Sequence, residues 1–97
     1  MAQGKVVSVG FRRYDVLNIT ATGDFPVEPA VFQIDRVESV MIFSDVAVKV
    51  RFGNVTNGEI TIPANHHVPF PLKVKQVWVR AASGGGPATV EIVGFQE

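Results

Sequence analysis

The last third of the chain, residues 60–95, contains the strand and turn patterns around which the rest is organised, and it reads ITIPANHHVPFPLKVKQVWVRAASGGGPATVEIVGF. In its run 77–80 the valines fall on one face, while Trp78 and Arg80 fall on the other, which is the period of a half-buried strand. A second alternating run follows the segment Ser-Gly-Gly-Gly-Pro at 83–87, whose composition is typical of a chain reversal. The pattern therefore predicts a β-hairpin with a glycine-rich tip.

Further segments have the valine, isoleucine and aromatic content, or the alternation, expected of strands. They are residues 6–9 and 11–20, which form two strands or one strand bent at Gly10, and residues 40–43, 46–52 and 60–62. Residues 30–40 fit either a short strand with extended coil or one to two turns of helix, and this alternative stays open.

The residues between these segments are typical of turns and loops. Asn57-Gly58 suits the positive φ angles of a type I′ hairpin turn. The proline-containing stretches 23–29 and 63–71 are predicted to be loops, because each proline removes a ladder donor and fixes φ. Between Val74 and Val77 the inward phase shifts by one residue, which predicts a β-bulge nearby.

About seven or eight short strands, separated by glycine, proline and asparagine, indicate an all-β protein. We expect one domain over residues 1–97, built as a small antiparallel β-sandwich or barrel that is jelly-roll-like. The 97 residues are enough for one core and too few for two.

The charge and the cysteine content of the chain argue against several classes of function. Nine basic and nine acidic side chains cancel, so no net field attracts the protein to nucleic acid or to an anionic membrane. The chain has no cysteine, which excludes disulfides, thiolate metal sites and cysteine nucleophiles. No segment has the roughly 20 apolar residues of a membrane span, and the N-terminus does not resemble a signal peptide.

No group of residues predicts catalysis. His66 and His67 are neighbours on an extended chain, so their side chains diverge, and the chain has no further histidine to complete a metal site. The carboxylates are scattered without calcium-loop spacing, and the glycines at 84–86 lack the lysine and hydroxyl of a phosphate-binding loop. We expect a non-enzymatic protein with no catalytic residue, no metal and no cofactor.

Residues out of phase with the core pattern predict association instead. If the valines of 77–80 point inward, Trp78 and Arg80 point outward as interface anchors. Val93 and Phe95 are likewise candidates for an exposed apolar patch, and Tyr14 is a further exposed aromatic. A single-strand-binding surface is the alternative that net neutrality disfavours. It would consist of basic residues interleaved with aromatic ones, namely Arg12, Arg13, Lys73, Lys75 and Arg80 with Phe11, Tyr14 and Trp78.

Residues 40–95 resemble small accessory virion proteins of tailed bacteriophages, of the capsid decoration, cement or head spike-base type. The matching elements are the valine-alternating strand 46–52, the step Ile-Thr-Ile-Pro at 60–63, the run 71–78 that ends in Val-Trp, and the closing strand 90–95. Here the closing turn is glycine-rich, where several of those proteins have threonine. The resemblance carries no catalytic residues.

The resemblance implies a structural protein that decorates or cements a phage capsid as a homo-oligomer, assembled in the host cytoplasm and located in the virion. A trimer is the favoured oligomer and a pentamer the other option. The partners would be further copies of the chain and the major capsid protein. The alternative is the base or adaptor of a head spike or tail fibre, acting as a receptor- or carbohydrate-binding module.

Overall fold

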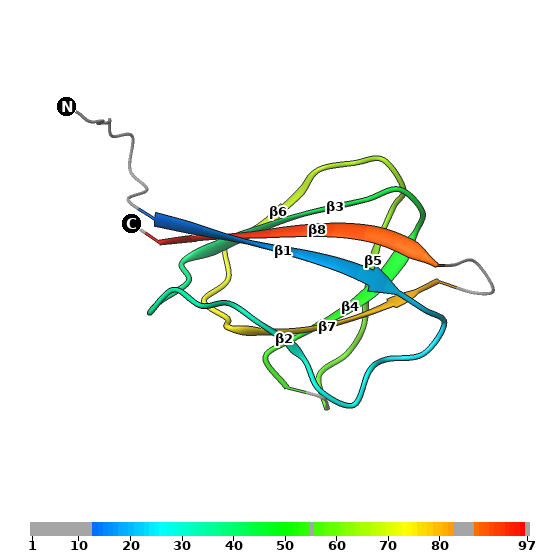
Figure 1. The fold of residues 1–97 in the computed structure, drawn as a ribbon, viewed down its shortest axis with the longest axis horizontal. Coiled ribbons are helices and arrows are strands. Elements are labelled where there is room, and N and C mark those ends of the chain that lie inside the picture. Colours follow the sequence, from blue (N-terminus) through cyan, green and yellow to red (C-terminus); the bar gives the residue numbers. More distant parts are fainter. Residues whose placement is uncertain (1–12, 55, 83–86, 97) are drawn as a thin grey trace.

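The computed structural model describes residues 13–54, 56–82 and 87–96 (Figure 1). The described residues contain eight strands and no helix, and accordingly no helix long and apolar enough to span a membrane. The strands are β1 (Arg13–Ala21), β2 (Ala30–Val31), β3 (Ser39–Ser44), β4 (Val48–Phe52), β5 (Ile60–Ile62), β6 (Val68–Phe70), β7 (Gln76–Ala81) and β8 (Ala88–Gln96). The all-β prediction is confirmed; the strand expected at 6–9 lies outside the described residues.

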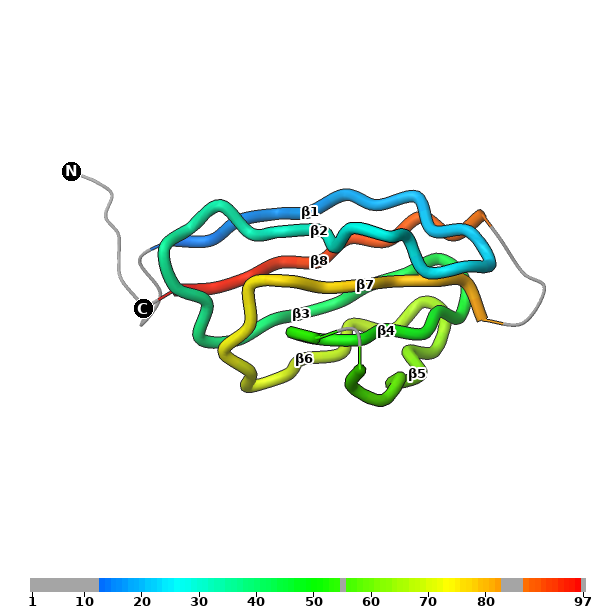
Figure 2. Tube along the Cα trace, turned by 90° about the horizontal axis from the view of Figure 1, so that it is seen from below, coloured from blue at the N-terminus to red at the C-terminus, as the bar shows by residue number. Residues whose placement is uncertain are grey.

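The strands form two antiparallel four-stranded sheets. Sheet I has the order β1-β8-β3-β6 and sheet II the order β2-β7-β4-β5. The chain passes from one sheet to the other at every connection except that between β4 and β5, which pair within sheet II. Two four-stranded sheets connected in this way are the arrangement of a jelly roll. Figure 2 shows β1 and β2 along one side of the sandwich, with β5 and β6 along the other.

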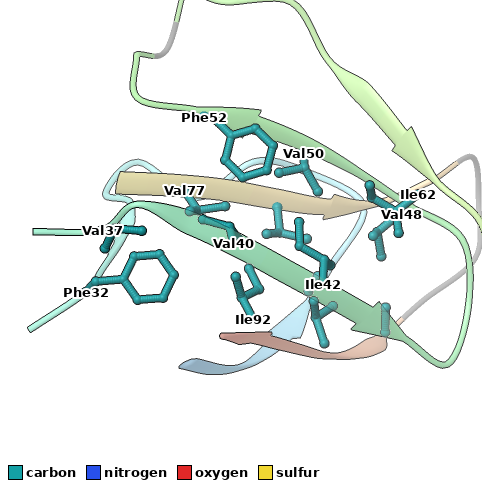
Figure 3. Packing of buried hydrophobic residues seen from close by; sticks show 14 of the residues in the cluster. Phe32, Val37, Val40, Ile42, Val48, Val50, Phe52, Ile62, Val77 and Ile92 are labelled. Atoms are coloured by element: carbon teal, nitrogen blue, oxygen red, sulfur yellow. The ribbon is translucent and has the colours of Figure 1, made fainter. Parts of the chain in front are cut away.

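The core lies between the two sheets (Figure 3). Period-2 alternation places every second side chain of β3, β4, β7 and β8 in it, so valine and isoleucine dominate. Among the fully buried side chains are Ile42, Val48, Val50, Ile62, Val77, Val90 and Ile92.

One end of the core is closed by Phe32, which is 1% exposed and follows β2. A Cβ added to Gly94 of β8 would lie 2.8 Å from the Phe32 ring. Because that ring is buried, any larger residue at position 94 would force it to shift within the packed core.

The predicted hairpin of the last two strands is wrong. β7 pairs with β4 and β2 in sheet II, whereas β8 pairs with β1 and β3 in sheet I. The connection between β7 and β8 therefore passes from one sheet to the other. Its glycines at 84–86 lie outside the described residues. Alternation identified both strands correctly but does not encode which strand pairs with which.

Three local predictions are also corrected. Residues 63–71 contain a strand, β6, whose central Pro69 is accommodated because β6 is an edge strand. The phase shift before Val77 is not a bulge, since residues 71–75 form no strand and β7 begins at Gln76.

The β4–β5 turn is a loop of several residues in which Gly53, and not Gly58, has positive φ (79°). The segment 30–40 is a two-residue strand followed by coil, without helix.

Candidate interaction surfaces

The outer face of sheet I is apolar over two cross-strand rows. Tyr14 of β1 lies opposite Phe95 of β8, and Val16 lies opposite Val93. Met41 of β3 extends the second row from the other side of Val93. Tyr14 is 69% exposed and Val16 is 37% exposed, while Val93, Phe95 and Met41 are half-buried. Three predicted interface residues, Tyr14, Val93 and Phe95, thus share one face.

A groove continues this apolar surface toward β6. It has a volume of about 370 Å³ and opens to solvent, and its lining is almost entirely apolar. The lining residues are Ser39, Val40, Met41, Pro69, Phe70, Pro71 and Phe95. Phe95 and Met41 belong to both the rows and the groove, so the two features form one surface, which we call the sheet I surface.

The outer face of sheet II is different, because its large aromatic is covered. Val77 and Val79 are in the core, so Trp78 points away from it, on the predicted face. Nevertheless Trp78 is only 6% exposed. The loop 22–29 leads directly into Ala30 of β2, which pairs with Val77, the neighbour of Trp78.

Charged and aromatic side chains gather on the outer face of sheet II around Trp78. Arg51 of β4 is directly opposite Trp78, and Arg80 is two residues along on the same face. The Phe25 ring from loop 22–29 lies 4.5 Å from the Arg51 guanidinium and 5.4 Å from that of Arg80. Glu59 binds both arginines, at 2.8 Å from Arg80 Nη2 and 3.5 Å from Arg51 Nη2. We call these four residues the sheet II cover.

The expectation that Trp78 and Arg80 are exposed anchors is therefore corrected. Arg80 is engaged with Glu59, and the Trp78 indole is buried although it faces outward. Its Nε1 has no hydrogen-bond partner among the described residues. The only sequence feature related to the burial of Trp78 is Phe25, in the proline-containing stretch 23–29. No pattern in the sequence predicts that this loop lies on the outer face of sheet II.

The remaining polar candidates connect loops to strands. Asp15 accepts a hydrogen bond from the Gln33 backbone N–H at 2.5 Å, and Asp45 accepts one from the Thr89 N–H at 2.8 Å. His66 Nδ1 lies 2.7 Å from the Ala64 carbonyl oxygen, and the His67 ring packs on Phe43 at 4.6 Å. In the described part of the chain, no three or more histidine, aspartate or glutamate side chains gather as a metal site.

The alternative of a single-strand-binding surface required Tyr14 and Trp78 to share a stacking platform. They lie on the outer faces of opposite sheets, and Trp78 is covered. The structure therefore does not bring these two aromatics together. Phe11 and Arg12, which belonged to the same hypothesis, lie outside the described residues.

No protein-family model and no curated protein matches this chain. Among solved structures, it is similar to the crystal structure of CoII HppE in complex with substrate, with 15% sequence identity and a TM-score of 0.49. The match covers 86% of this chain and 43% of that one, so this chain spans less than half the length of that protein. A likeness of this degree carries no argument about the present chain.

Proposed function

We propose that this protein is a non-enzymatic assembly protein that decorates or cements a phage capsid as a homo-oligomer. The observation that carries the proposal is the sheet I surface, where Tyr14, Val16, Val93 and Phe95 form contiguous apolar rows beside an apolar groove. A contiguous apolar patch on a small domain marks an interaction site. The jelly-roll architecture occurs in viral capsid proteins, and equally in lectins and cupins, so the fold permits this function without selecting it.

The polar groups support a structural role for the chain. Asp15, Asp45 and Glu59 each bind main-chain or arginine partners that fix a loop or cover a face. These contacts within the chain explain why the three carboxylates lie where they do, and no bound substrate is needed to explain it. The setting on a capsid rests on the resemblance of residues 40–95 to accessory virion proteins.

The proposal is tested by measuring the molar mass by light scattering and by co-sedimentation with expanded phage capsids. We expect a stable oligomer that sediments with capsids, and a Met41→Asp variant that folds but does not sediment. Met41 is half-buried at the centre of the sheet I surface, so a carboxylate there disrupts the contact. Wild-type protein that never sediments with capsids would contradict decoration.

A spike or fibre module that binds carbohydrate is the second candidate, and one observation favours it. Tyr14 and Phe95 are adjacent aromatics on an outer sheet face, an arrangement suited to stacking on sugar rings. Oligosaccharide titration followed by NMR would move the Tyr14 ring signals in that case. Unchanged signals across a panel of bacterial surface glycans would exclude this candidate.

A further inference from the structure

The edge strands of the two sheets are unequal. β2 has two residues, while β5 and β6 have three each. β6 contains Pro69, Pro63 follows β5, and Pro29 precedes β2. Short edges and proline are the usual protection against pairing with another chain. By contrast, β1 is an edge of sheet I with nine residues and no proline, and its charged residues, Arg13 and Asp15, are confined to its first three positions.

β1 has one side available for pairing. Within the described part of the chain its only strand partner is β8. An antiparallel strand directs alternate pairs of N–H and C=O groups to either side, so half of the β1 backbone groups face away from β8. The outward edge of a nine-residue strand is a template for main-chain hydrogen bonds with an added strand.

The side chains along β1 are also incompletely covered. Leu17 and Ile19 point toward the core but remain half-buried, because the facing edge strand β2 extends over only two residues. On the outer face, Val16 is 37% exposed. An added strand would bury apolar surface on both faces of β1 at once.

We infer that β1 pairs antiparallel with β1 of a second copy, which joins the two sheets I across a two-fold axis. The nine-residue edge needs a partner edge of similar length, and among the described strands β1 is the only such edge. Self-pairing of one strand is isologous and closes as a dimer. The inference deepens the proposed homo-oligomer, on which it rests, and replaces the expected three-fold arrangement with a two-fold one.

Charge is compatible with self-association. The segment 16–21 of β1 contains no charged residue, and the whole chain has no net charge, so two copies do not repel each other. An axis beside Asp15 would place two carboxylates opposite each other and is disfavoured. A two-fold axis beside Val16, Leu17 or Asn18 keeps the two carboxylates apart, and most residues of β1 then pair with β1 of the second copy.

The test uses a double variant, Val16→Lys with Asn18→Lys. Both side chains lie on the outer face and are exposed, so the fold tolerates lysine there. In each of the three registers above, a lysine at 16 or 18 lies opposite a lysine of the second copy. We expect wild type to have twice the 10.5 kDa of one chain in light scattering, and the double variant to dissociate with a dissociation constant raised about a hundredfold.

A matched control carries the same added charge away from the edge, as Gln76→Lys with Thr89→Lys. Both residues are exposed, and both lie on strands that have partners on each side. We expect this control to remain a dimer. A double variant that dimerises as tightly as wild type, or a wild-type mass of one, three or five chains, would overturn the inference.

Single cysteine variants give an independent result, because the chain has no cysteine of its own. Under mild oxidation, Val16→Cys or Asn18→Cys, or a mixture of the two, should form disulfide-linked dimers, whereas Gln76→Cys should not. Crosslinking only at Gln76→Cys would refute edge pairing. A trimer that sediments with capsids would support the proposed function and refute pairing through β1. A dimer linked through β1 that does not sediment with capsids would support the β1 interface and refute the proposed function.

Discussion

The two outer faces of the sandwich each present aromatic residues, yet only one is open to a partner. On sheet I, Tyr14 is 69% exposed, and the apolar rows around it continue into the groove. On sheet II, Trp78 is 6% exposed beneath Phe25, Arg51, Arg80 and Glu59. The sandwich therefore uses its own loop 22–29 as the partner of sheet II and leaves sheet I available for another chain.

The position of a residue in the alternation of a strand therefore determines the side to which its side chain points, but not how exposed that side chain is. Trp78 and Tyr14 both point away from the core. Trp78 is covered by residues that are up to about fifty positions away in the sequence, and Tyr14 is not. Substitutions on sheet II should thus affect the stability of the fold, and those on sheet I should affect association.

The largest expected effect is that of Trp78→Ala. Removing a buried indole should lower the free energy of unfolding by about 3 kcal/mol, because a cavity forms beneath the cover. Trp78→Phe is the matched control and should cost about 1 kcal/mol, since most of the volume is retained and no hydrogen bond of Nε1 is lost. Denaturant unfolding measures both. Equal, negligible losses would show that Trp78 is not covered in solution.

The next effect is that of Phe25→Ala, which removes the ring that lies over both arginines. We expect a loss of about 1–2 kcal/mol from the cation–π contacts and the lost burial. Trp78 is the only tryptophan of the chain, so its fluorescence reports the cover directly. The emission maximum should shift to longer wavelength in the folded variant, and an unshifted maximum would mean that the arginines alone exclude water.

A smaller effect is expected for Glu59→Gln. The side chains of Glu59, Arg80 and Arg51 are 28%, 24% and 29% exposed, so their ion pairs are partly shielded from solvent. Losing them should cost about 1 kcal/mol, measured by thermal unfolding. The control is Asp35→Asn, whose pair with Arg13 is 3.7 Å long between side chains 87% and 56% exposed and should contribute almost nothing. A larger loss for the control would contradict the cover.

The smallest effect on stability is expected for Tyr14→Ser. Because Tyr14 is largely exposed, the free energy of unfolding of the isolated chain should change by less than about 0.5 kcal/mol. Self-association should still weaken, since the ring lies beside the β1 edge. Analytical ultracentrifugation against wild type separates the two quantities. Unfolding of the variant with unchanged association would reverse the assignment of the two faces.

The sequence allowed the fold class and most strands to be predicted, because alternation in 46–52, 77–80 and 89–93 is local information. Strand pairing could not be predicted. The glycine-rich segment between β7 and β8 has the composition of a hairpin tip, although the two strands belong to different sheets. The pairing is decided by burial of both strands against non-local partners, which no turn composition encodes.

The candidate surfaces were partly predictable for the same reason. Val93 and Phe95 were recognised because they are out of phase with Val90 and Ile92, and the structure places them with Tyr14 on one face. The groove was missed, because it forms where β6 meets β3 and Pro69 had suggested a loop. The open edge of β1 was missed as well, since an edge is defined by the order of strands in a sheet.

The most direct test of the difference between the two faces is amide hydrogen exchange of the wild-type protein at low and high concentration. We expect protection to rise with concentration in β1, Arg13–Ala21, while the strands of sheet II and loop 22–29 exchange at unchanged rates. Added protection in β4, β7 or loop 22–29, with none in β1, would show that the chain associates through sheet II and not through the edge of sheet I.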